Sequence, residues 1–233
     1  MVDNAYSVKI FGHWPARDIN EEKCDEDAKR DLYLKRLRDD YVDGFFAKKC
    51  EEGTLRGMKL KGLVRLCFTE IRLSQVETHT RRYGKLGIGF DRKFLINRGG
   101  RPVIYIPFEA TDKLMEDTMK FVYKNSKGQV HERLKWLFAF VKRMSDKPTT
   151  HKDSQDFLEE LEWRVVYGEK LDAGHFTRVP DGTYRWKFAP KDVRLLVFPD
   201  ETAKVMALND AVLKPLFSKH TPIMLTLEDC ANF

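Results

Sequence analysis

Three stretches decide the fold class: LVRLCFTE at residues 63–70, YGKLGIGF at residues 83–90 and RPVIYIPF at residues 101–108. Each is a short run of apolar, β-branched or aromatic residues bounded by glycine, proline or polar residues, a pattern typical of β-strands. Two further segments, WRVVY at residues 163–167 and VRLLVF at residues 193–198, have the same character. So many short strands favour an α+β fold over a regular βα repeat.

Helical patterns surround these strands. Apolar residues recur at helical spacing in residues 21–50 and 200–216, and in residues 112–143 apart from a break at residues 125–128. We therefore predict an α+β fold with a mixed or antiparallel β core and flanking helices. No proline- or serine-rich linker interrupts the chain, which predicts a single domain over residues 1–233. Shorter elements are expected as strands at residues 6–11 and 222–227 and as helical turns at residues 74–80 and 156–160.

The composition is that of an ordinary globular protein, with 42% hydrophobic and 33% charged residues. No apolar run approaches the roughly 20 residues of a membrane helix, and the stretch MVDNAYSVKIFGHW does not resemble a secretion signal. We therefore expect a cytoplasmic protein with no membrane partner. The four cysteines form no C-x-x-C pair, so we expect reduced, mostly buried thiols and no metal site. They are Cys24, Cys50, Cys67 and Cys230.

Positive charge is concentrated in one segment. The formal net charge is +6, and residues 79–101 hold seven Lys and Arg against the single acid Asp91. Such a segment is typical of a surface that binds phosphate groups, although an ordinary solvated basic surface explains it equally well. The candidates for nucleic-acid contact are Arg81, Arg82, Lys85, Arg92 and Lys93.

Familiar catalytic signatures are missing from the sequence. There is no G-x-x-x-x-G-K-[ST], H-E-x-x-H or G-x-S-x-G pattern, and the six histidines show no metal-ligand spacing. Gly84, Gly87 and Gly89 form G-x-x-G-x-G, which differs from the dinucleotide fingerprint and indicates close packing in a strand. Any enzymatic function must therefore be argued from other residues.

The strongest candidate for chemistry is an E-x-E pair, Glu160 and Glu162, at the start of the predicted strand over residues 163–167. If both residues belong to the strand, their side chains share one face; if a helix continues through Glu162, they do not. Paired carboxylates can stabilise an oxocarbenium-like state and accept a proton from an attacking group. The alternatives are a solvated acidic run that includes Glu159 and, more weakly, a metal-dependent nuclease site with Glu70.

Several of these stretches resemble the core of the AbiGi family of abortive-infection proteins. The resemblance is carried by VRLCFTEI at residues 64–71, LS at residues 73–74, YGKLGIGF at residues 83–90, PVIY at residues 102–105 and ELEWR at residues 160–164. AbiGi proteins are described as antitoxins of a phage-resistance system. The resemblance thus implies a role in phage defence and a cognate toxin or antitoxin protein as partner.

A more distant resemblance is to ADP-ribosyltransferase toxins that modify nucleic acids, and it raises the possibility of their split sheet. These enzymes order a His or Arg, an aromatic-Ser/Thr step and an E-x-E along three strands. The resemblance implies that Glu162 orients the nicotinamide ribose of NAD and that Glu160 activates the acceptor. The triplet at Cys67 departs from the usual aromatic-Ser-Thr/Ser. The residues that the resemblance assigns to NAD binding are His13, Phe68, Thr69 and Tyr83.

Two main functions follow as expectations. The first is an NAD-dependent ADP-ribosyltransferase toxin of a phage-defence system, with nucleic acid as acceptor. The alternative is a non-enzymatic antitoxin, or a module that binds nucleic acid or a protein partner. The first requires Glu162 to face a cleft, whereas the second leaves the E-x-E pair dispensable.

Overall fold

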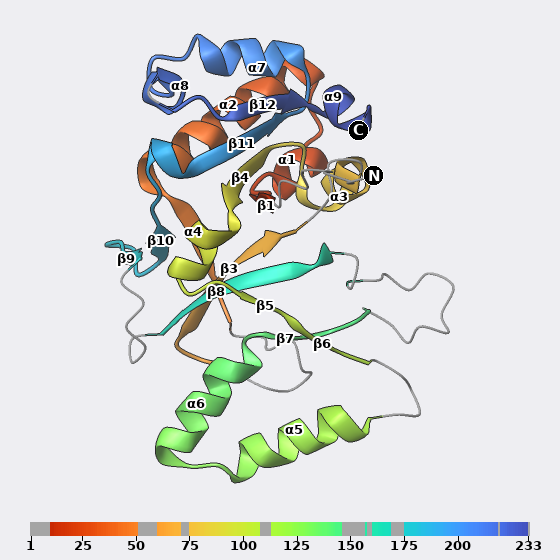
Figure 1. Ribbon diagram of the computed structural model, residues 1–233, viewed down its shortest axis with the longest axis vertical. Helices are drawn as coiled ribbons and strands as arrows, with labels where there is room; N and C mark the ends of the chain where they lie inside the picture. Colours follow the sequence, from red (N-terminus) through yellow and green to blue (C-terminus); the bar gives the residue numbers. More distant parts are fainter. Residues whose placement is uncertain are drawn as a thin grey trace, which may run out of the picture. The chain divides into compact units, whose positions relative to one another are not determined.

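The computed structural model confirms the α+β class (Figure 1). Its chain divides into two compact units, whose strands are mostly antiparallel. Unit 1 comprises Met1–Phe45, Phe68–Ile96 and Lys187–Phe233, and unit 2 comprises Phe46–Cys67 and Asn97–Trp186. The structure describes residues 10–50, 60–70, 75–107, 113–145, 157, 160–168, 175–218 and 220–232.

The sheet of unit 1 is centred on β4 (Gly87–Asp91). This strand pairs antiparallel with β1 (Ile10–His13) on one side and with β11 (Val193–Phe198) on the other. Beyond β11, β12 (Ile223–Thr226) adds a parallel strand. β1 also pairs antiparallel with the end of β3 (Leu63–Thr69), where Gly12 lies opposite Thr69.

Helices of unit 1 are anchored by capping and ion pairs. α2 (Glu26–Asp43) begins where the Asp25 side chain accepts a hydrogen bond from the backbone N–H of Ala28. It packs against α7 (Glu201–Leu208), and Arg30 Nε donates to the Asp200 carboxylate over 2.9 Å. The remaining helices are α1 (Arg17–Glu21), α3 (Val76–Tyr83), α4 (Arg92–Asn97), α8 (Lys214–Ser218) and α9 (Leu227–Ala231).

The core of unit 1 is aromatic. The rings of Phe45, Phe68 and Phe90 lie 5.9 to 6.5 Å apart in edge-to-face arrangements, which the ring quadrupoles favour. At Gly87 an added Cβ would lie 2.8 Å from the indole of Trp14, so only glycine fits there. This supports the interpretation of that glycine as a close-packing residue of a strand.

Unit 2 is built from short strands and a pair of helices. β8 (Glu162–Gly168) pairs with β3 and with β5 (Arg101–Pro102), while β6 (Ile104–Ile106) pairs parallel with β7 (Val141–Arg143). The other elements are β2 (Phe45–Lys49), the hairpin of β9 (Phe176–Arg178) and β10 (Tyr184–Trp186), α5 (Leu114–Asn125) and α6 (Gly128–Phe138).

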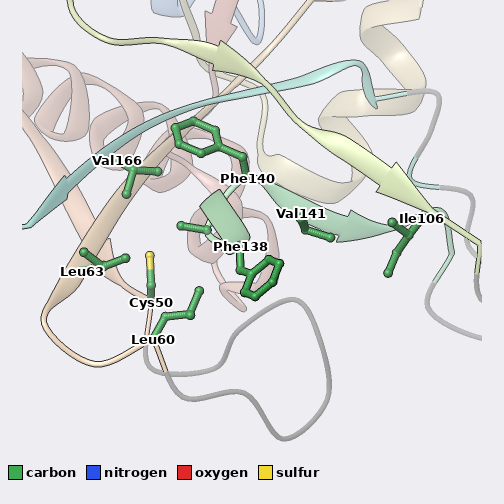
Figure 2. Packing of buried hydrophobic residues seen from close by; sticks show 9 residues of the cluster. Cys50, Leu60, Leu63, Ile106, Phe138, Phe140, Val141 and Val166 are labelled. Atoms are coloured by element: carbon green, nitrogen blue, oxygen red, sulfur yellow. The ribbon is translucent and has the colours of Figure 1, made fainter. Parts of the chain in front are cut away.

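The core of unit 2 lies between these strands and helices (Figure 2). Phe138 and Phe140 leave the end of α6 and pack with residues from β6, β7 and β8. Met119 and Tyr123 of α5 pack against the same cluster. Its buried members are Cys50, Leu60, Leu63, Ile106, Phe138, Ala139, Phe140, Val141 and Val166.

Two predicted helices are replaced by strands at their ends, and a third, predicted over residues 200–216, divides into α7 and α8. The helix predicted over residues 21–50 ends at Gly44, whose φ of 86° lies in the left-handed region, and β2 follows. The helix predicted up to residue 143 ends at Phe138, and residues 141–143 form β7 instead. In both places the apolar residues that follow the helix form their backbone hydrogen bonds with another strand. Local periodicity does not reveal such pairing.

Two predicted strands also changed. Residues 83–90 do not form one strand, because Tyr83 ends α3 and β4 begins at Gly87. Between them, an added Cβ on Gly84 (φ 98°) would lie 2.3 Å from the backbone of Ala16. Residues 101–108 divide into β5 and β6, which pair with different partners. The strands predicted at residues 163–167 and 193–198 are confirmed as β8 and β11.

The prediction of one domain over residues 1–233 stays a prediction, since compact units need not fold independently. Within the parts of the chain that the structure describes, none of the helices has the length and hydropathy needed to span a membrane. Of the predicted shorter elements, residues 6–9, 74, 156, 158 and 159 lie outside the described residues.

Candidate functional site

The E-x-E pair lies at a sharp turn into β8. Glu160 occupies a short 3-10 turn, Leu161 has a left-handed backbone with φ of 42°, and Glu162 is the first residue of the strand. A left-handed backbone is uncommon for leucine, and it marks a point where the surroundings dictate the conformation. No helix therefore continues through Glu162, but the two glutamates do not belong to one strand either.

Both carboxylates nevertheless meet at one cation. Lys142 of β7 donates from Nζ to Glu160 over 2.6 Å and to Glu162 over 2.7 Å. The same ammonium lies 4.2 Å from the ring centre of Phe157, a cation–π distance. Glu160 and Glu162 are only 4% and 5% exposed, so this is a buried ion cluster. The interpretation of the pair as a solvated acidic run is therefore wrong.

Arg164 completes the cluster from the next inward position of β8. Its Nε donates to the second oxygen of Glu162 over 2.6 Å. One of its terminal nitrogens donates to the backbone carbonyls of Ala139 and Val141, over 2.6 and 3.2 Å. A fully buried guanidinium needs such partners, because each unsatisfied N–H would cost free energy. The arginine thereby connects the start of β8 to the chain between α6 and β7.

Two more groups surround Glu162. The Tyr105 hydroxyl accepts a hydrogen bond from the backbone N–H of Glu162 over 2.9 Å. Burial raises the pKa of this hydroxyl, and the nearby carboxylate acts in the same direction. Burial also raises the pKa of the Cys67 thiol to about 12, with a further contribution from Glu162. Both groups stay protonated at neutral pH, so neither is an activated nucleophile.

The electrostatics of the cluster are balanced. Burial opposes the charge of Glu162, but the attraction of Arg164 and Lys142 outweighs it and holds the pKa of that carboxyl well below its usual range. Burial likewise opposes the charge of Arg164, yet Glu162 raises the arginine pKa above its usual value. Two carboxylates and two cations leave the cluster without net formal charge.

A second, partly buried ion pair starts from the next residue of β7. The Arg143 guanidinium donates three hydrogen bonds of 2.8 to 3.1 Å to the carboxylate of Glu116 on α5. Lys120 Nζ lies 2.5 Å from the same carboxylate. Burial raises the pKa of Glu116, but these two cations outweigh it and lower the pKa overall. Successive side chains of a strand point to opposite faces. Lys142 therefore contacts the glutamates at the start of β8, whereas Arg143 contacts Glu116 of α5.

The residues assigned to NAD binding lie in unit 1. The ring of His13 lies 4.2 Å from Phe45 and 5.7 Å from Phe68, while Thr69 is buried beside them at the end of β3. Tyr83 packs instead on His79, with ring centres 4.6 Å apart. His13, Phe68 and Thr69 are thus neighbours, whereas the two glutamates belong to unit 2.

The predicted basic residues are spread over α3, α4 and, for Lys85, the loop between α3 and β4. Arg81 is exposed and its terminal nitrogen lies 2.9 Å from Glu77 one turn earlier. Arg92 and Lys93 are exposed in the first turn of α4, which contains no acid. Arg82 and Lys85 are half-buried. Nucleic-acid binding by these residues stays a prediction.

A hollow of about 970 Å³ lies beside the start of α6 in unit 2. Its lining includes Lys127, His131, Arg133 and Lys135, but neither glutamate of the E-x-E pair. Among the described residues, no group of three or more His, Cys, Asp or Glu side chains is arranged to hold a metal ion.

Sequence reasoning missed Lys142 and Tyr105, and it gave no role to Arg164. One signal was present: Lys142 and Arg143 follow the apolar run FAFV directly, and cations beside buried strands need carboxylate partners. The helical interpretation of residues 112–143 hid this signal.

Comparison with known proteins places the chain among abortive phage resistance proteins. Residues 49–199, more than half of the chain, match the family model described as "Putative abortive phage resistance protein AbiGi, antitoxin". The protein therefore belongs to the AbiGi family. No curated protein and no solved structure matches the chain.

Proposed function

We propose that this AbiGi protein acts as an antitoxin that binds its partner, and not as a catalyst. The observation that carries the proposal is the state of the E-x-E pair: both carboxylates are buried, and cations of the same unit occupy them. The description of the family as an antitoxin supports the same conclusion.

A transferase would need a different arrangement. Its glutamate must accept hydrogen bonds from a ribose hydroxyl while the oxocarbenium-like state forms. In this protein one oxygen of Glu162 faces Arg164 and the other faces Lys142. A neutral hydroxyl would have to displace a charge-assisted hydrogen bond, which is about twice as strong as a neutral one. The cluster therefore suits a structural role.

The test is neutralisation of a toxin encoded in the same defence locus. Co-expression of the wild-type chain should restore growth, and calorimetry of the purified chain with NAD should show no binding. The double variant Lys142→Met, Glu160→Gln removes one carboxylate together with its cation, and it should neutralise as well as the wild type at matched folding. Failure of the wild type to neutralise would overturn the proposal.

The ADP-ribosyltransferase with NAD as substrate is the second candidate. It is favoured by the proximity of His13, Phe68 and Thr69 on adjacent strands of unit 1. Micromolar NAD binding that is lost in Glu162→Gln, together with toxicity of the chain expressed alone, would establish it. Nucleic acid would then be sought as the acceptor, with Arg92→Gln and Lys93→Gln expected to weaken binding and its salt dependence.

A further inference from the structure

α5 has two unlike sides, and the inward side is committed to unit 2. Glu116 is held by Arg143, and Met119 and Tyr123 pack on the hydrophobic core. These residues are spaced three and four apart and so lie along one face of the helix. α5 is therefore fixed in place by both an ion pair and apolar contacts.

The outward side of α5 is apolar as well. Leu114 is 77% exposed and Phe121 is 68% exposed, seven residues apart on the same face. Met115 and Val122, each one position further along, are also exposed. A solvent-facing helix side is normally polar, whereas these four large side chains form a stripe along the helix. We call these four residues the α5 stripe.

We propose that the α5 stripe is the docking site for an acidic amphipathic helix of a protein partner. The inference deepens the proposed antitoxin function, on which it rests, by naming the surface and the chemistry of the partner. A helix recognises such a surface through apolar residues at positions i, i+3 or i+4, and i+7.

Charge around the stripe selects an acidic partner. The exposed charged residues of the described segment 113–127 are three lysines and one acid. They are Lys113, Lys124, Lys127 and Asp117. The other acid of this segment, Glu116, is buried and paired. Complementary charge at the rim of an apolar contact increases the association rate and suppresses wrong partners.

Size and rigidity suit a helical partner. The 12 residues of α5 rise by about 18 Å, which corresponds to roughly three turns. A partner helix of similar length can align its apolar ridge with Leu114 and Phe121. Because α5 is already anchored by Arg143, docking does not have to order the receptor helix.

A second copy of this chain is disfavoured as the occupant. Two α5 stripes brought together would place their exposed lysines near one another, and the whole chain carries a net charge of +6. An anionic lipid surface would satisfy the same chemistry, but the antitoxin description of the family points to a protein. Both are outcomes that the test distinguishes.

The first experiment uses a defined probe: a fluorescent 14-residue peptide with Leu and Phe at helical spacing and Glu elsewhere. The wild-type chain should bind it, and Phe121→Gln combined with Leu114→Gln should weaken binding at least about tenfold. The control is Val205→Gln on α7, which alters an exposed apolar residue of unit 1 and should leave binding unchanged. A peptide of the same composition in scrambled order should bind no better to the wild type than to the double variant.

Equal binding of both peptides, or no binding of the ordered one, would overturn the inference. Concentration-dependent dimerisation that the double variant abolishes would overturn it in favour of self-association. Binding to phosphatidylserine vesicles that the same variant abolishes would overturn it in favour of a membrane.

The second experiment separates this inference from the proposed function. The toxin from the same locus is titrated against the wild type and against the double variant, with thermal unfolding checked to within about 2 °C. Toxin binding by the wild type that is lost in the double variant supports both the antitoxin function and the α5 stripe as its docking site. Equal, tight binding by both proteins refutes the α5 stripe and leaves the antitoxin function standing. Absence of toxin binding to the wild type refutes the proposed function itself, while the peptide result still decides the stripe.

Discussion

The start of β8 and the outer side of α5 reverse the usual distribution of residues within unit 2. At β8, two buried glutamates and a buried arginine gather around a partly buried lysine. On α5, Leu114 and Phe121 face outward. Buried charges are tolerated where they are paired and hydrogen-bonded, and exposed apolar residues where a contact is to be made. Under the two proposals above, the charged residues maintain the fold and the apolar ones bind the partner.

The largest expected effect is the loss of the shared cation of the β8 cluster. Lys142→Met leaves Glu160 and Glu162 buried with one cation fewer, and breaking a buried pair typically costs about 3–5 kcal/mol. Urea unfolding followed by circular dichroism should show this loss in the free energy of unfolding.

The double variant Lys142→Met, Glu160→Gln provides the control for that prediction. It removes a negative charge along with the positive one and leaves the Glu162–Arg164 pair intact, so it should recover at least about 1 kcal/mol of the loss. A single variant as stable as the wild type would show that water replaces the lysine and that the cluster is not closed.

A smaller loss is expected where β7 meets α5. Arg143→Met removes a bidentate partner of Glu116 but leaves Lys120 beside the carboxylate. The free energy of unfolding should fall by about 1.5–3 kcal/mol. Arg133→Met, an exposed position on α6, should change it by less than about 0.5 kcal/mol. Equal effects at both positions would show that the Arg143–Glu116 pair does not stabilise the fold.

Acid should weaken the same contacts. The pKa of Glu116 is lowered in the folded state, so its stabilising contribution is complete above the unfolded value of about 4.3. That contribution is lost as pH falls through the folded pKa, because the unfolded chain then binds more protons. Urea unfolding between about pH 6 and pH 3 should show a smaller decrease in stability for Glu116→Gln than for the wild type. The reverse order would show that Glu116 is not paired.

The smallest effect on stability is expected at the α5 stripe. Phe121→Gln should change the free energy of unfolding by less than about 0.5 kcal/mol, because the ring is exposed and glutamine is at least as good a helix former. Met119→Ala on the inward side should cost about 1–3 kcal/mol. If Phe121→Gln destabilised the fold as much as Met119→Ala, the ring would be a core residue and no docking surface.

Much of the fold was predictable from local pattern. The apolar runs at residues 63–68 and 193–198 form β3 and β11 as expected, and the break at residues 125–128 separates α5 from α6. β7 was not predictable, because its three residues become a strand only through pairing with β6. A strand of that length has too few positions to show a period of two.

The candidate site was predictable in part. The sequence singled out Glu160 and Glu162 as candidate catalytic carboxylates. It did not single out Lys142, the cation that both carboxylates contact, because that lysine falls within a predicted helix. The left-handed Leu161 could not be foreseen either, since leucine carries no preference for that conformation. The α5 stripe escaped because helical periodicity identifies apolar residues without saying which side of the helix the core will cover.

The sequence by itself determined the α+β class, the AbiGi resemblance and the E-x-E pair, because these depend on residue type and near-neighbour spacing. Tertiary structure alone decided that the pair is occupied by Lys142 and Arg164 and that Leu114 and Phe121 remain outside. The reason is physical: the energy of a charge or an apolar side chain depends on what surrounds it. For Glu162 those surroundings include Arg164, two positions away, but also Lys142 and Tyr105, which lie 20 and 57 positions away in the chain.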